Sequence, residues 1–225
     1  MCGRFSLRTP AAILAELFQL AENPAWNPRY NIAPSQPAPV VVMSPEHPDR
    51  QFRQWRWGLI PGWAKDPGIG TRMINAQAET ASSKPAFRAA FRRRRCLVLT
   101  DGFYEWQQLG RRKQPFYVRM KHDTPFAFAG LWEHWKSPDG ASIESCTLLT
   151  IEPNDLIRRF HHRMPVILDP QDYAVWLDPS IQEPEQLQPL LRPYPSEALT
   201  AHPVSTRVNN PANEVPECIE PLASR

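Results

Sequence analysis

Residues 96–106 read Cys-Leu-Val-Leu-Thr-Asp-Gly-Phe-Tyr-Glu-Trp, and this stretch decides the fold class. The short apolar run at residues 96–100 predicts a buried strand. Asp101 and Gly102 are typical turn residues, and the aromatic-rich residues 103–106 predict a second strand after them. The centre of the chain therefore predicts a β-sheet rather than a helical bundle.

Strand and helix signals are interspersed on both sides of this stretch. Apolar residues at helical spacing predict an amphipathic helix over residues 11–22, begun by Thr9 and Pro10, and a second helix over residues 83–95. Further strands are expected at residues 40–42, 51–59, 115–120, 126–132, 146–151 and 204–208, and short helices at 154–160 and 169–176. Since no regular βαβ spacing is present, we expect an α+β fold. It would be a single domain over residues 1–225 with a curved, mostly antiparallel, barrel-like β core flanked by short helices.

The composition excludes several classes of protein. The chain has 225 residues, of which 42% are hydrophobic and 22% charged, as in globular proteins. No run approaches the ~20 apolar residues of a membrane span, and no secretory leader opens the chain, so we expect a cytoplasmic monomer with no membrane partner. The four cysteines are far apart, and neither a metal motif nor a nucleotide-binding loop is present. We therefore expect no disulfide, no metal and no cofactor.

One segment of the chain is strongly basic. Between Lys84 and Arg95 there are six basic residues and no acidic one. Such a run is either a solvated face or a track for phosphate groups, and the sequence leaves both open.

The N-terminus carries two nucleophiles once Met1 is removed, which the small residue that follows it favours. The α-amine and the thiol of Cys2 have ordinary pKa values of about 7.7–8.0 and about 8.5, so both have reactive fractions near neutral pH. The amine can attack an aldehyde to give a Schiff base, and the thiol can then close a thiazolidine ring on the same carbon. The ring-opened abasic deoxyribose of DNA is one such aldehyde.

Seven sequence blocks recur in an order that resembles the SOS response-associated peptidase (SRAP) family. The blocks are Met-Cys-Gly-Arg-Phe at residues 1–5, Tyr-Asn-Ile-Ala-Pro at 30–34, Trp-Gly-Leu-Ile-Pro-x-Trp at 57–63, Asn-Ala-Gln-Ala-Glu-Thr at 75–80, the opening stretch at 96–106, His-x-Arg-Met-Pro at 161–165, and Val-Asn-Asn at 208–210. Their joint order covers nearly the whole chain, which makes the resemblance specific.

The resemblance implies that the protein captures abasic sites in single-stranded DNA through a thiazolidine at Cys2, in a positively charged cleft. It implies that Glu105 is the general acid and base, and that His161 shuttles protons and stabilises the Schiff base. Asn75 would position the Cys2 amine and the opened sugar. The resemblance also implies removal of the chain's own first residue, and it extends to an AP-lyase activity.

The predicted DNA contacts follow from the same blocks. They are Arg4, Asn31, Trp57, Trp63, Arg72, Gln77 and Arg163. Arginine forks suit phosphate oxygens and tryptophans suit unpaired bases, although one of the two tryptophans is expected in the core. Gln77 stands where the family has arginine. We therefore expect a phosphate contact to move to Arg72 or to the basic helix, and the salt dependence of DNA binding to be shallower.

Two other functions stay open at this point. Glutamine amidotransferases also begin with Met-Cys-Gly, and in them Cys2 would attack an amide, although the Arg4-Phe5 pair and the lack of later glycine-rich motifs disfavour this. A non-catalytic module for single-stranded nucleic acid would use the curved sheet and the basic helix, with Cys2 incidental. No Ser-His-Asp or Cys-His-Asn arrangement is recognisable, so we expect peptidase activity to be limited to self-processing.

Overall fold

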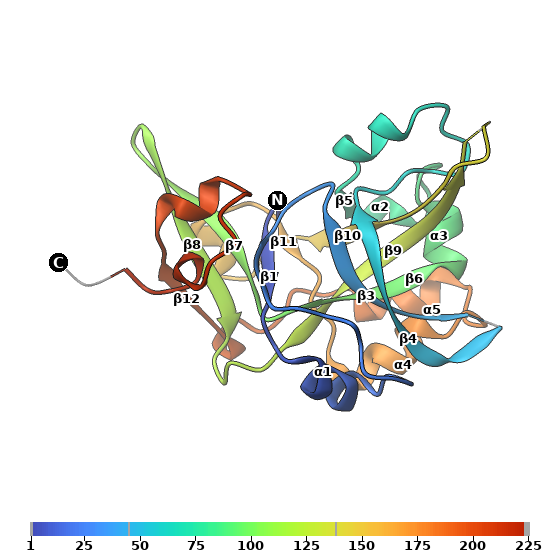
Figure 1. The fold of residues 1–225 in the computed structure, drawn as a ribbon, viewed down its shortest axis with the longest axis horizontal. Coiled ribbons are helices and arrows are strands. Elements are labelled where there is room, and N and C mark those ends of the chain that lie inside the picture. The colour runs from blue at the N-terminus through green and yellow to red at the C-terminus, as the bar shows by residue number, and fades with distance from the viewer. Residues whose placement is uncertain (1, 45, 138, 223–225) are drawn as a thin grey trace.

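The computed structural model describes residues 2–44, 46–137 and 139–222, and its larger unit is a closed β-barrel (Figure 1). The barrel strands are β3 (Pro37–Ser44), β4 (His47–Trp57), β6 (Arg95–Thr100), β9 (Phe126–Lys136) and β10 (Ser142–Ile151). They are ordered β10-β4-β3-β6-β9, and the ring closes because β9 also pairs with β10. Pairing is antiparallel except between β4 and β10. A closed ring leaves no edge strand open to pairing.

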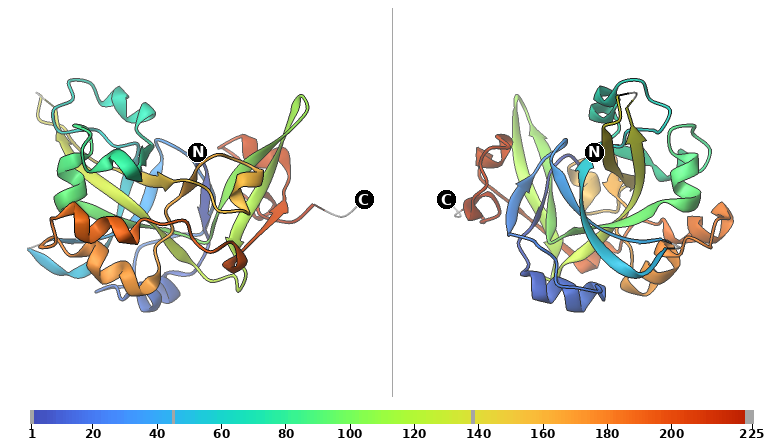
Figure 2. Two further views of the ribbon diagram at one scale, coloured as in Figure 1. Left: turned by 180° about the vertical axis from the view of Figure 1, so that it is seen from behind. Right: turned by 45° about the vertical axis from the view of Figure 1, so that its right-hand side comes forward.

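A five-stranded antiparallel sheet stands beside the barrel. Its order is β12 (Leu199–Pro203), β8 (Arg112–Met120), β7 (Gly102–Leu109), β1 (Phe5–Leu7) and β2 (Arg29–Ile32). Two short strands, β5 (Asn75–Gln77) and β11 (Met164–Pro165), pair with β10 at the side of the barrel. Figure 2 shows the sheet and the barrel side by side, with β1 on the side of the sheet that faces the barrel.

The stretch at residues 96–106 connects the two units rather than forming a hairpin. β6 belongs to the barrel and β7 to the sheet, so the two strands do not pair. Thr100 Oγ1 accepts from Gly102 N and donates to Ser6 O, both at 3.0 Å, which holds the crossing against β1. A Cβ at Gly102 would lie 2.6 Å from Val118 O, so only glycine fits there.

β1 is the strand of the sheet whose Phe5 packs against the barrel. The Phe5 ring lies edge-on to Trp57 at 5.1 Å and to Phe128 at 6.2 Å between ring centroids. All three side chains are fully buried. This packing fixes the residues that precede Phe5, and hence Cys2, at the junction of the two units.

The helices are short and lie outside the strands. They are α1 (Ala11–Phe18), α2 (Ala78–Ala81), α3 (Arg88–Arg93), α4 (Tyr173–Leu177) and α5 (Pro184–Leu187). Within the described ranges, none of these helices has the length and apolar character that crossing a bilayer requires. The predicted α+β fold with a barrel-like, mostly antiparallel core is confirmed.

Several predicted boundaries were wrong. The helix expected over residues 11–22 stops at Phe18, because Gln19 takes a left-handed conformation with φ of 53°. Thr9 does not cap it, since its hydroxyl donates to Asp101 at 2.5 Å instead. The helix expected over residues 83–95 is limited to α3.

The last predicted strand was wrong in position. Residues 206–209 form a 3₁₀ helix (Thr206–Asn209), which begins where Ser205 Oγ accepts from Arg207 N at 3.3 Å. The strand of this region is β12, a few residues earlier. A hydroxyl that caps a turn offers the backbone an alternative to strand pairing.

Candidate functional site

Cys2 is fixed from two sides at the junction of the sheet and the barrel. Asn75, on β5, donates from Nδ2 to Cys2 O at 2.8 Å. Tyr104, on β7, donates from its backbone N to Arg4 O at 3.0 Å, and the Cys2 thiol points to the same carbonyl oxygen at 3.7 Å. Burial, and then the neighbouring Glu105 carboxylate, raises the pKa of the Cys2 thiol far above its ordinary value. The thiol is therefore protonated at neutral pH. Met1, whose removal the sequence predicts, lies outside the described residues.

Glu105 is a buried carboxyl group beside this cysteine. Its side chain is 2% exposed, and no described residue forms a hydrogen bond with its Oε1. Burial raises its pKa to about 7, because desolvation disfavours the ionised form. Both the acid and the carboxylate are therefore populated near neutral pH, which suits proton transfer.

His161 is placed by its neighbours in the turn before β11. Phe160 packs on Phe116 with ring centroids 4.7 Å apart, and Phe116 is the cross-strand partner of Glu105. His161 Nδ1 accepts from Arg163 N at 3.0 Å, so the neutral ring carries its proton on Nε2. Burial lowers the His161 pKa to about 4, which keeps the ring neutral at physiological pH.

Glu105 and His161 meet at one open pocket of about 480 Å³. Its lining residues are Glu105, Trp106, Lys113, His161 and Asn209. Trp106 Nε1 donates to Asn209 Oδ1 at 2.8 Å, which fixes the indole at the rim. The four predicted catalytic residues thus lie together, since Cys2 contacts Asn75 and adjoins Glu105, which shares the pocket with His161.

Three pocket residues were missed by the sequence interpretation. Trp106 and Asn209 lie within quoted motif blocks, so those blocks could have identified them. Lys113 comes from β8, and only the pairing of β7 with β8 brings it to the pocket.

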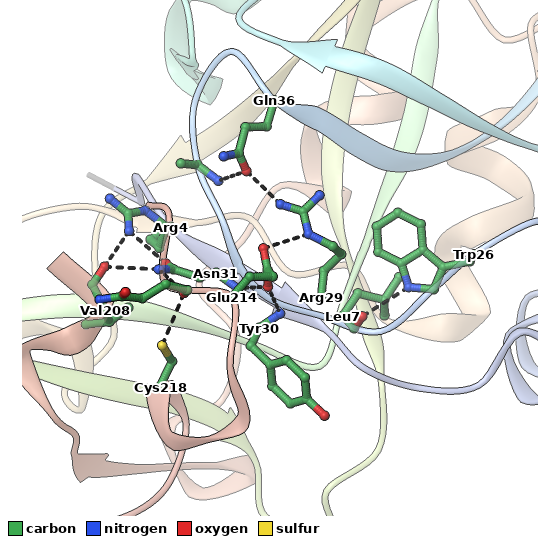
Figure 3. Close-up of polar contacts among 12 residues, drawn as sticks. Arg4, Leu7, Trp26, Arg29, Tyr30, Asn31, Gln36, Val208, Glu214 and Cys218 are labelled. Carbon is green, nitrogen blue, oxygen red and sulfur yellow. Dashed lines mark hydrogen bonds and ion pairs between the residues drawn. The ribbon is translucent and has the colours of Figure 1, made fainter. Parts of the chain in front are cut away.

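Arg4 and Asn31 form an internal network rather than an open surface (Figure 3). Arg4 Nη1 donates to Asn31 Oδ1 at 2.7 Å and also to Val208 O. Asn31 Nδ2 donates to the carbonyl oxygens of Asn210 and Asn213 at 3.0 and 2.8 Å. Asn31 is fully buried, so its assignment as a DNA contact is corrected to that of a structural brace.

Arg4 is 9% exposed, and burial lowers its pKa. A phosphate contact by Arg4 stays a prediction.

The two tryptophans differ as the sequence interpretation expected. Trp57 is fully buried and donates from Nε1 to Ile74 O at 2.8 Å. A ring inside the core offers no face to a base, so Trp57 is corrected from DNA contact to core residue. Trp63 is 61% exposed, and its stacking on unpaired bases stays a prediction.

The remaining predicted DNA contacts lie on the surface near β5. Arg72 and Gln77 are both exposed. Arg163 forms a two-pronged ion pair with Glu79, with both N–O distances at 2.7 Å. Because Glu79 neutralises Arg163, a phosphate that binds this arginine must compete with a carboxylate of the same chain.

The fold and the site thus combine a buried cysteine at the second position with a neighbouring buried acid and a neutral imidazole that shares a pocket with this acid. The chain belongs to the SOS response associated peptidase (SRAP) family, whose model matches residues 1–211. The resemblance inferred from the seven motif blocks is therefore confirmed.

Individual relatives cover nearly the whole chain. The abasic site processing protein YoqW of Bacillus subtilis is 42% identical over 224 residues, which cover 98% of this chain and 99% of the relative. The abasic site processing protein HMCES of Gallus gallus is 31% identical and covers 99% of this chain and 78% of its own length.

Solved structures support the fold. A protein from Bacteroides thetaiotaomicron matches with a TM-score of 0.88 at 24% identity, covering 99% of this chain and 100% of that one. A protein from Bordetella bronchiseptica matches with a TM-score of 0.77 at 27% identity, covering 91% and 100%. The barrel and the adjoining sheet are thus a shared architecture.

Proposed function

We propose that this protein captures abasic sites in single-stranded DNA by forming a thiazolidine with Cys2 after Met1 has been removed. The observation that carries the proposal is a chain of neighbours: Asn75 holds Cys2, Cys2 lies beside Glu105, and Glu105 shares a pocket with His161. The naming of its relatives as abasic site processing proteins supports DNA with abasic sites as the substrate.

The first step is attack of the Cys2 α-amine on the aldehyde carbon of the opened deoxyribose. A C–N bond forms, and water is lost to give a Schiff base. Protonated Glu105 supplies the proton that the departing oxygen needs. The Nε2–H of neutral His161 donates a hydrogen bond to the developing charge on the sugar oxygens. Asn75 holds the Cys2 carbonyl oxygen and so restrains the residue whose amine reacts.

The second step closes the ring. The Cys2 thiol adds across the C=N bond, so that a C–S bond forms and the thiol proton passes to the nitrogen. Because the raised pKa keeps the thiol protonated, this step needs a base, and Glu105 is ionised after the first step. The same carboxyl can return the proton, which makes the linkage reversible in principle.

Self-processing and AP-lyase activity, the two further activities that we propose, use the same site. Self-processing adds water across the peptide bond between Met1 and Cys2 and releases Met1, which uncovers the amine. AP-lyase activity removes the proton at C2′ of the Schiff base and breaks the C3′–O bond to the phosphate. We propose that the protein acts as a monomer.

Amide hydrolysis is the second candidate for an N-terminal cysteine. It requires a thiolate, but burial and the Glu105 carboxylate both favour the protonated thiol. This observation weighs against a glutaminase.

A denaturing gel with single-stranded DNA that carries one abasic site tests the proposal. We expect a heat- and SDS-stable band of combined mass with the wild type, after mass spectrometry has shown that Met1 is absent. The band should be lost with Cys2→Ala and with intact DNA. Absence of the band with processed wild type would refute capture. Glutaminase activity would then support the amidohydrolase, and binding unaffected by Cys2→Ala would support a non-catalytic module.

A further inference from the structure

A positively charged hollow lies on the barrel, outside the pocket of Glu105 and His161. It has a volume of about 370 Å³ and is lined by side chains of α3 and the end of α2. The lining residues are Ser82, Arg88, Ala89, Arg92, Arg93 and Arg94. We call this hollow the arginine cleft.

The arginine cleft carries charge that the rest of the described chain does not neutralise. Arg88, Arg92 and Arg93 are exposed, and none of them forms an ion pair with a described residue. Arg93 donates from Nε to Gln182 Oε1 at 3.2 Å, which orients one guanidinium without cancelling its charge. Arg94 differs, because Glu133 lies 2.7 Å from its Nη2.

The neighbouring Arg95 shows that this is not simply a run of solvated charges. Its guanidinium is buried and donates to the backbone carbonyl oxygens of Phe91, Arg92, Trp176 and Asp178. This brace ties the end of α3 to the C-terminal end of α4. The exposed arginines of α3 are therefore presented from a fixed support, so less conformational entropy is lost when they bind.

The arginine cleft is connected to Cys2 by a short piece of chain. Asn75, which holds Cys2, begins β5, and α2 follows β5 directly and ends beside Ser82. In Figure 1, α2 lies between β5 and α3. At about 3.3 Å per strand residue and 1.5 Å per helix residue, Asn75 and Ser82 are at most roughly 16 Å apart. At 3.4 Å per nucleotide, a stacked DNA strand spans that distance in about five nucleotides.

We propose that the arginine cleft binds the phosphodiester backbone of DNA that flanks the abasic site. Guanidinium groups match phosphate oxygens in two-pronged geometry, and the cleft lining contains no aromatic side chain that could stack on a base. The contact is therefore independent of sequence and holds the strand while Cys2 reacts. This inference rests on the proposed function, because the DNA that the cleft binds flanks the abasic site that Cys2 captures.

The test compares two DNA lengths and two charge-matched double variants. One variant is Arg88→Gln/Arg92→Gln, and the control is Arg53→Gln/Lys121→Gln, which neutralises two exposed residues outside the cleft. The DNAs are a single strand of about 20 nucleotides with a central abasic site, and one of five nucleotides that also has a central abasic site. In the short DNA the two nucleotides on either side of the lesion span only about 7 Å at 3.4 Å per nucleotide, so they do not reach the cleft. Affinity is measured against salt concentration with intact DNA of both lengths, and crosslinking rate with abasic DNA.

We expect the cleft variant to lower the log–log salt slope on the long DNA by about 1.4, since each single-strand phosphate contact contributes about 0.7. A fourfold rise in salt then costs the wild type about sevenfold more affinity than the variant. Crosslinking of the short DNA should be equal in the two. Equal slopes on the long DNA, or equal losses in cleft and control variants, would overturn the inference. Failure of wild-type protein to crosslink either DNA would refute the proposed function instead, while the slopes with intact DNA still report on the cleft.

Discussion

Replacing Glu105 with glutamine should stabilise the protein at alkaline pH while abolishing efficient capture. The carboxyl ionises at about 7 in the folded protein, against its ordinary value of 4.5, and the cause is burial. Between these two values the folded state holds more protons than the unfolded state. The wild type therefore becomes less stable as the pH rises through this window. The stability contributed by the protonated carboxyl is fully present only below about pH 4.5.

The magnitude follows from the two ionisation constants. Each factor of ten corresponds to about 1.4 kcal/mol, so a pKa raised from 4.5 to about 7 costs the folded state about 3 kcal/mol once the carboxyl is ionised. Glutamine has nearly the same shape and no charge to desolvate. We expect the unfolding free energy of Glu105→Gln, relative to that of the wild type, to increase by about 3 kcal/mol as the pH rises from about 4.5 to about 8.

The assay is urea unfolding of both proteins at these two pH values. Glu152→Gln, at an exposed position, is the matched control and should follow the wild type. The variant should also crosslink abasic DNA at least about 100-fold more slowly, since general acid–base groups contribute 10²–10⁴-fold. Parallel stability curves for wild type and Glu105→Gln would refute the argument that Glu105 is desolvated.

Three further changes have defined outcomes. Gln77→Arg should steepen the salt slope of single-strand binding by about 0.7, and identical slopes would contradict a phosphate contact at this position. Glu79→Gln should release Arg163 from its ion pair and raise DNA affinity at low salt, whereas unchanged binding would show that Arg163 contacts no phosphate. Arg95→Met should lower the unfolding free energy by about 3 kcal/mol, because it leaves buried carbonyl groups unpaired. Arg94→Met, at a partly exposed ion pair, should cost less than about 1 kcal/mol in the same urea titration.

The strands were predictable because their signal is local. The apolar run at residues 96–100 predicts a buried strand, whichever sheet of the fold that strand joins. The sequence did not predict that β6 joins the barrel while β7 joins the sheet. This division depends on contacts with β1, which is almost a hundred residues away in the chain. The helix over residues 11–22 was overestimated for a related reason. Ile13 and Leu17 continue the helical pattern but are 46% and 50% exposed, so the periodicity did not report burial.

The candidate site was partly predictable, because its chemical groups lie in recognisable blocks. Cys2, Asn75, Glu105 and His161 come from four separate blocks; Asn75 contacts Cys2, Cys2 lies beside Glu105, and Glu105 shares the pocket with His161. The surroundings were harder to predict. A polar side chain that braces the interior has the same sequence signature as one that faces DNA, which is why Asn31 was misassigned.

The same internal brace makes reactivity depend on the fold being complete. The carbonyl oxygens of Val208 and Asn213, near the end of the chain, hold Arg4 and Asn31. Arg4 in turn supplies the carbonyl oxygen that the Cys2 thiol points to. Residues 208–213 therefore fix Arg4 and, through it, the surroundings of Cys2. In an unfolded chain the Cys2 thiol would have its ordinary pKa and react with oxidants and other electrophiles, whereas in the folded protein it is buried and protonated. We infer that burial restricts the thiol to an electrophile that the terminal amine has already captured.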